Sequence, residues 1–231
     1  MTEQPVPVPV PFGSGKPAQY LVARLFGELT LYPNPIADPD RVLDIGYALF
    51  SARASALGLA LEGGGEVSEG AGHVGVFQLT LSDDRLPVQP FLTVVGDVIT
   101  RLGRLRLDAI DVTLPEREGS AQPGAPDSGD WFALIDPAQW VPVRVTLECA
   151  DEAIAAVASA AIDQQKWYQD VFRLDARSED HARHRVTLTG SLAEWSFDGL
   201  GFLTAYLYDL AARQGIVTPL TVNTQRTQPP D

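Results

Sequence analysis

A proline- and glycine-rich segment at residues 115–130 divides the chain near its middle, and it constrains the fold more than any other feature. The segment holds three prolines, three glycines and two serines, and its only apolar residues are two alanines. This composition is typical of a linker. We therefore predict two units, residues 19–114 and 131–226, each long enough for a small domain.

The two ends of the chain are predicted to lie outside these units. Residues 1–18 alternate proline and valine before a Gly-Ser-Gly-Lys-Pro run. Proline fixes φ and lacks an N–H donor, so this segment favours polyproline II and cannot pair as an inner strand. We predict a flexible N-terminal arm, with an arm that docks on a partner subunit as the alternative, and a short tail at residues 227–231.

An internal repeat relates the two units. The tripeptide Phe-Leu-Thr occurs at residues 91–93 and again at 202–204, and a glycine follows each copy, at Gly103 and Gly215. Both copies follow one strand-like run and precede another. This pattern predicts a duplicated unit.

The first unit reads as β-α-β-β-α-β. Asp38 is an expected N-cap, Gly58 an expected C′ residue, and the spacing of Val42, Ile45 and Leu49 predicts the buried face of the helix between them. The glycine-rich run at 63–72 is expected to be a hairpin loop. The predicted elements are a strand at 20–32, a helix at 39–57, strands at 59–61 and 73–81, a helix at 90–102 and a strand at 105–114.

The second unit gives the same order. Ser196 is an expected N-cap, and Pro219 requires the last strand to lie at a sheet edge because proline cannot donate to a ladder. The predicted elements are a strand at 140–148, a helix at 151–165, a hairpin of strands at 170–176 and 185–192, a helix at 197–214 and a strand at 216–224.

The order β-α-β-β-α-β is that of ferredoxin-like folds. We therefore predict an α+β protein with two tandem ferredoxin-like units, each an antiparallel sheet with two helices on one face. One continuous α+β domain whose two sheets merge is the alternative.

Charge and composition exclude several classes of protein. The chain has 30 acidic against 17 basic residues, a net charge of −13, which opposes binding to nucleic acid or an anionic membrane. Cys149 is the only cysteine, so no intrachain disulfide forms. The start of the chain has no signal-peptide pattern, and arginine greatly outnumbers lysine. We predict a cytoplasmic bacterial protein.

No motif predicts catalysis, a metal or a cofactor. His181 and His184 fit no zinc spacing, Cys149 lacks a nearby base in the sequence, and the glycine-rich run carries glutamates that would repel phosphate. The candidate ligand-binding residues are His73 at a strand start, and Tyr206 and Tyr208 on the last helix.

Two functions remain open. The first is a non-catalytic, acidic protein-interaction or assembly protein: an adaptor, a subunit, or an immunity-type protein that masks a basic partner, with a homo-oligomer as a further form. The second is a small-ligand-binding protein or cofactor-independent enzyme with a pocket between sheet and helices. Residues 115–231 carry 17 acidic against 9 basic residues, a net of −8, whereas residues 1–114 carry 13 against 8, a net of −5. All four tryptophans also lie in the second half and could supply apolar anchors. We therefore expect the second half to contribute more to partner binding.

Overall fold

The computed structural model describes residues 20–33, 38–58, 62–81, 86–116, 132–180 and 184–227. The predictions for the N-terminal arm at 1–18, for the strand at 59–61 and for nearly all of the linker and the tail concern residues outside these ranges.

The described strands form one eight-stranded antiparallel sheet, so the protein is a mixed α/β protein whose two halves share a sheet. The strand order is β2-β3-β1-β4-β8-β5-β7-β6. The strands are β1 (Tyr20–Leu31), β2 (Glu62–Val67), β3 (Gly70–Thr80), β4 (Gly103–Leu114), β5 (Val141–Glu148), β6 (Phe172–Asp180), β7 (Arg185–Leu192) and β8 (Leu220–Arg226).

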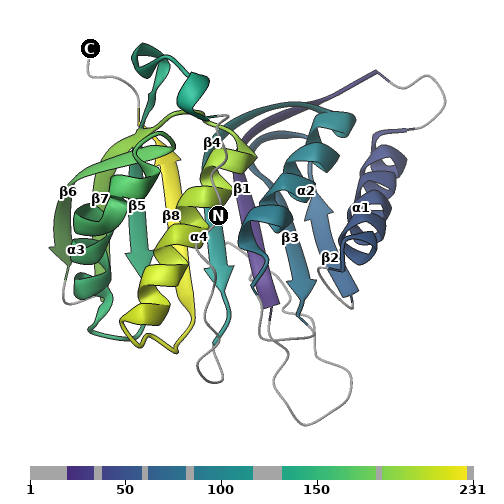
Figure 1. The fold of residues 1–231 in the computed structure, drawn as a ribbon. Helices are drawn as coiled ribbons and strands as arrows, with labels where there is room; N and C mark the ends of the chain where they lie inside the picture. Colours follow the sequence, from purple (N-terminus) through teal and green to yellow (C-terminus); the bar gives the residue numbers. More distant parts are fainter. Residues whose placement is uncertain are drawn as a thin grey trace, which may run out of the picture.

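Four α-helices lie in front of this sheet in the view of Figure 1. They are α1 (Pro39–Ala56), α2 (Val88–Leu102), α3 (Ile154–Gln164) and α4 (Phe197–Arg213), and short 3-10 turns occur at η1 (Phe132–Leu134), η2 (Pro137–Gln139) and η3 (Gln165–Tyr168). One continuous core of apolar side chains fills the space between the helices and the sheet. Burial of this apolar surface is the main stabilising contribution to such a fold.

The two halves meet at the centre of the molecule in both layers. In the sheet, β4 pairs with β8 from Ala109 to Leu114. In the helix layer, α2 packs against α4, and the Thr93 hydroxyl donates to the Asp198 carboxylate at 2.6 Å. The Trp195 indole N–H adds a hydrogen bond to the Leu107 carbonyl at 2.8 Å. The structure therefore has the merged sheet that the sequence left open as an alternative.

Several local predictions are confirmed. The Asp38 side chain accepts a hydrogen bond from the Arg41 N–H at the start of α1, and the Ser196 side chain accepts one from Gly199 at the start of α4. Gly58 follows α1 with φ +64°, a conformation that glycine adopts without the steric cost that a Cβ brings.

The predicted buried face of α1 is wrong. Ile45 is 54% exposed, and Val42 and Leu49 are only partly buried. The buried residues are Gly46, Phe50 and Ala54, whose face is turned by about 100° from the predicted one. Val42 and Leu49 therefore pack at the border of the core, and only Ile45 faces solvent. Both sets recur at helical spacing, and the positions of β2 and α2 decide which one enters the core.

The predicted glycine-rich loop at 63–72 is also wrong. Most of it forms the strands β2 and β3, which pair from Glu62↔Thr80 to Val67↔Gly75, and only the residues at 68 and 69 form the turn. Glycine is uncommon in strands, but residues 62–67 form a strand because they pair with β3.

The predicted edge position of the last strand is wrong as well. β8 lies between β4 and β5, in the interior of the sheet. Pro219 is tolerated because the strand begins at the next residue, Leu220. No ladder hydrogen bond requires an N–H at position 219.

Among the described residues, no helix combines the length and the apolarity that crossing a membrane requires.

Candidate functional site

The three candidate ligand-binding residues do not form one site. His73 is exposed on β3, where its ring packs edge-on against Phe26 at 5.6 Å between centroids. Tyr206 and Tyr208 are both buried on α4. Only Tyr206 lines a described recess. It lies on α4 in the second half of the protein, whereas His73 lies on β3 in the first half.

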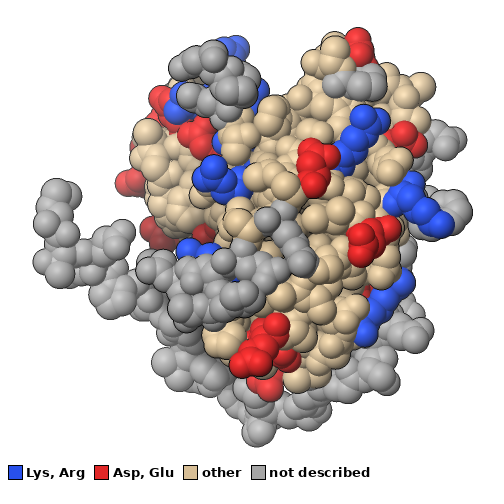
Figure 2. All heavy atoms as spheres, turned by 90° about the vertical axis from the view of Figure 1, so that its left-hand side faces the viewer, with Lys and Arg blue, Asp and Glu red and all other residues tan. Residues whose placement is uncertain are grey.

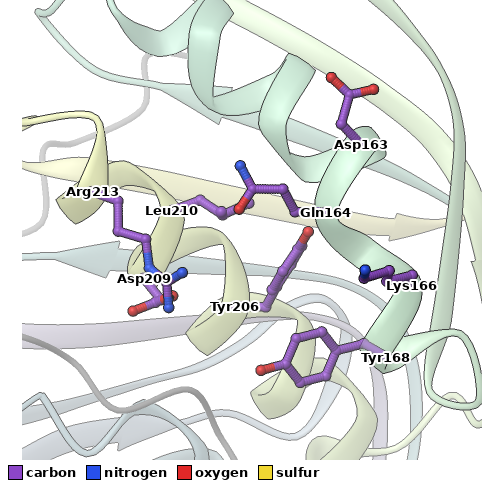
Figure 3. Close-up of a pocket in the computed structure, with 8 residues that line it drawn as sticks. All are labelled: Asp163, Gln164, Lys166, Tyr168, Tyr206, Asp209, Leu210 and Arg213. Carbon is purple, nitrogen blue, oxygen red and sulfur yellow. The ribbon is translucent and has the colours of Figure 1, made fainter.

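The recess at Tyr206 lies between the end of α3, η3 and the last turns of α4, and has a volume of about 460 Å³. Figure 3 shows the phenol of Tyr206 between the side chains of the two facing elements. The rings of Tyr168 and Tyr206 are 5.0 Å apart and form one wall. The residues lining the recess are Asp163, Gln164, Lys166, Tyr168, Tyr206, Asp209, Leu210 and Arg213.

The polar groups of this recess are largely paired within the protein. The Tyr206 hydroxyl donates to the Ala161 carbonyl at 2.9 Å, and Arg213 Nη2 lies 2.6 Å from the carboxylate of the buried Asp209. Burial raises the pKa of Tyr206 far above its usual range and also raises that of Tyr168. Both phenols therefore stay protonated at neutral pH and do not serve as bases.

A second recess, of about 340 Å³, lies where the two halves meet. Its lining includes Arg104 and Leu105 of β4, Trp195, and Phe197 at the start of α4. Ser196 also lines it, and its hydroxyl accepts the Gly199 N–H as the cap of α4. No histidine or carboxylate is among the described lining residues to act as a base for that hydroxyl.

Metal binding finds no support in the residues that the structure describes. They contain no group of three or more His, Cys, Asp or Glu side chains placed to hold an ion. His184, which follows the undescribed residues 181–183, has φ 45° in the turn before β7. His181 itself lies outside the described residues.

Cys149 lies in the turn between β5 and α3, where its sulfur and the backbone of Asp151 exchange hydrogen bonds at 3.4 Å. Its side chain is buried, and this burial raises the pKa of the thiol. The loss of hydration at this position outweighs the favourable backbone contact, so the thiol stays protonated and is a weak nucleophile.

We expect iodoacetamide to alkylate Cys149 at least about tenfold more slowly in the native protein than in the unfolded chain near neutral pH.

The raised pKa of the Cys149 thiol also means that the unfolded state loses its thiol proton first as the pH rises past about 8.5. Stability should therefore fall above that pH through this group. Denaturant titrations at several pH values test this, because the Cys149→Ala variant should lack that part of the decline.

The most distinctive surface of the described structure lies at the other end of the sheet, on α1. Four of its apolar residues are exposed and share one helix face. They are Ile45, Ala48, Ala52 and Ala56. Figure 1 shows α1 at the end of the helix layer, beside the terminal strand β2. We call this α1 face, together with the outer edge of β2, the edge surface.

The outer edge of β2 has no pairing strand among the described residues. An unpaired strand edge presents a row of N–H and C=O groups to which another chain can bond. The α1 helix packs against β2 and α2 through the face that carries Phe50 and Ala54. Its exposed apolar face lies on the other side of the helix and points away from the sheet. Exposed apolar groups and unpaired backbone groups thus lie at the same end of the molecule, but they face in different directions.

The edge surface is acidic. Residues 38–70 contain six acidic residues and two arginines. Arg53 forms an ion pair with Asp97 of α2, and Arg41 is exposed on the same helix face as Ile45. The excess of acids over bases here is therefore four in sequence, and it includes Glu69, whose carboxylate accepts the Leu31 N–H. The opposite end of the molecule differs, because Figure 2 shows blue and red side chains interspersed on the face that carries α3 and β6.

The tryptophans do not mark a comparable surface in the second half. Trp140 and Trp195 are partly buried against the core, and Trp140 also lies 4.3 Å beneath the guanidinium of Arg173. Trp131 and the side chain of Trp167 lie outside what the structure describes.

Comparison with known proteins places the chain in no family. No protein-family model matches the sequence, and no curated protein matches it.

Proposed function

We propose that the protein is a non-catalytic protein-interaction or assembly protein, and that the edge surface is where it binds its partner. The observation that carries this proposal is the second apolar face of α1. A helix at the end of a sheet needs one apolar face to pack on its own core, and Gly46, Phe50 and Ala54 supply that face. Ile45 and the alanines aligned with it have no such role.

The charge of the protein supports the same class of function. A net charge of −13, with a local excess of acids at the edge surface, speeds encounter with a basic partner and suppresses binding to nucleic acid. An adaptor, an assembly subunit and a protein that masks a basic partner all fit this description.

We also infer that the chain is a tandem duplication of a ferredoxin-like unit. The first half has the order β2-β3-β1-β4, and the second half has the corresponding order β6-β7-β5-β8. Phe91 and Phe202, from the repeated tripeptide, are both buried on the helix that precedes the last strand of their half. Exposed helix faces at the ends of such a merged sheet would then be available for interaction.

The test compares two tagged variants in extracts of the native organism. Ile45→Glu places a charge on the edge surface, whereas Leu134→Glu makes the same chemical change at a leucine of η1 that is 79% exposed. Neither change should alter stability by more than about 0.5 kcal/mol, because both sites are exposed. We expect Ile45→Glu to lose a partner that the wild type and Leu134→Glu retain.

Cross-linking then locates the contact. Retention of every partner by Ile45→Glu, or cross-links that map only to α3 and α4, would contradict the proposed function of the edge surface. A partner that remains bound in 1 M salt would keep the interaction but remove acidity as its cause, since the Debye length is then only about 3 Å.

The Tyr206 recess supports a second candidate, a small-ligand-binding protein. Its volume of about 460 Å³ and its aromatic wall are suited to a small planar molecule. Native mass spectrometry of the purified chain tests this candidate. A bound metabolite lost in a Tyr168→Ala variant would favour it over the interaction protein.

A further inference from the structure

The hydrogen bonds of the β2–β3 hairpin fix the orientation of the open edge. The Ser68 N–H donates to the Val74 carbonyl at 2.7 Å, and this pair continues the β2–β3 register by one step. Bonded and non-bonded pairs alternate along an antiparallel ladder. The N–H and C=O of Gly64 and Glu66 therefore face β3, whereas those of Gly65 point outward.

The packing around Gly65 supports this orientation. A Cβ added there would lie 2.4 Å from the carbonyl oxygen of Val76, so the α-carbon of Gly65 faces β3, as it does at non-bonded positions. Its N–H and C=O must then point the other way. The lack of side chains at 64 and 65 also allows another backbone to approach closely, a known role of glycine within strands.

The two faces of this edge differ in chemistry. Val67 is buried beneath the helices, and Glu66, its neighbour in the strand, is exposed on the face without helices. An added strand would keep this alternation, because successive side chains point to opposite faces. Its residues on one face would lie beside Glu66, and those on the other would lie beside Val67, on the side of the sheet that the helices cover.

We propose that the edge surface binds an extended, basic segment of a partner protein, which adds to the sheet as a strand beside β2. Lysine or arginine side chains would alternate with apolar ones, the basic set lying beside Glu66 and the apolar set beside Val67 on the helix side of the sheet. This inference rests on the proposed function and adds the mode of binding and the class of partner. Main-chain hydrogen bonds give such complexes affinity, and alternate side chains give them specificity.

A second copy of the chain is a poorer occupant of this surface. The exposed acids beside this edge include Asp40, Asp44 and Glu66, so a second copy would bring the same negative charges to the interface. Like charges at facing strand positions are destabilising. A basic segment removes this repulsion and replaces it with attraction.

The probe for this inference is a synthetic peptide of alternating lysine and valine, with a peptide of alternating glutamate and valine as control. NMR amide exchange is measured on the full chain with and without peptide at millimolar concentration. We expect the basic peptide to slow exchange at Gly65 and Val67, whose N–H groups point outward. Exchange at Gly64 and Glu66, whose N–H groups already face β3, should change little.

Charge variants test the second half of the proposal. Glu66→Lys should weaken binding of the basic peptide by about 3- to 10-fold, from the loss of one exposed attraction and the gain of one repulsion. Glu152→Lys, at an exposed position before α3, makes the same charge change in the other half and should leave binding unchanged.

Three results would overturn the inference. They are unchanged exchange at Gly65 with saturating peptide, equal binding of the acidic peptide, and a dimer of the isolated chain that Ile45→Glu dissociates. The last result would leave the proposed function intact with a second copy as partner. Loss of the native partner in Ile45→Glu, together with unchanged exchange at Gly65, would likewise retain the interaction surface and reject only the added strand.

Discussion

Replacement of Phe50 by alanine should lower the free energy of unfolding by about 3–5 kcal/mol, the range found for aromatic residues truncated in a core. Phe50 is fully buried, and its ring packs edge-on against Phe77 and Phe91, with centroids 5.0 and 6.1 Å away. Such aromatic contacts add to the stabilisation that burial alone gives. The truncated side chain would leave a cavity at the point where α1 meets both the sheet and α2.

Urea titration of the wild type and the variant measures this change, and Ile45→Ala is the matched control. Ile45 lies on the opposite face of the same helix and is 54% exposed, so its truncation should cost no more than about 0.5 kcal/mol. Equal losses for the two variants would mean that α1 packs through both faces, and the edge surface would then not be available to a partner.

The same helix shows how far the sequence could predict the fold. Its limits follow from local signals, namely the cap at Asp38 and the glycine at 58 with positive φ. Its buried face does not, because Val42, Ile45 and Leu49 recur at helical spacing just as Gly46, Phe50 and Ala54 do. The large side chain of Phe50 is the one sequence signal that favours the face that is buried.

Long-range pairing explains the other errors in the predicted fold. Glycines at 63–65 have weak strand preference, and only the neighbouring β3 makes them a strand. Pro219 excludes an interior position only if it lies within the strand, and β8 begins one residue later. Whether β4 and β8 pair across the two halves depends on contacts between residues about a hundred positions apart, which no local pattern contains.

The candidate sites show the same limit. Tyr206 was predicted from its place on an apolar helix, and it does line a recess. His73 was predicted from its place at a strand start, but it lies exposed on the first half of the sheet. The edge surface was not predicted, because Ile45 was assigned to the core and the residues of β2 were assigned to a hairpin loop. The available signal was that α1 has apolar residues at helical spacing on two faces, of which its own core can bury only one.

Replacement of Gly96 by valine should destabilise the contact between the two halves by about 1–3 kcal/mol, the usual range for an overpacked core. A Cβ at Gly96 would lie 2.6 Å from Cδ2 and 2.9 Å from Cβ of Phe197. Phe197 cannot relieve this overlap by rotating its ring, since its own Cβ is involved, so α2 and α4 would have to move apart. The higher helix propensity of valine offsets only a few tenths of a kcal/mol of this cost.

A double-mutant cycle with Phe197→Ala tests the cause of the loss. If the overlap with the ring dominates, the cost of Gly96→Val should fall by more than half in the Phe197→Ala background, a coupling expected of residues in contact. Additive losses would instead trace the effect to the Cβ of residue 197, which alanine keeps, or to α2 itself. Because α2 and α4 are joined to β4 and β8 beneath them, we expect the loss to lower one cooperative unfolding transition of both halves. Two separate transitions would show that the halves fold as independent units despite their common sheet.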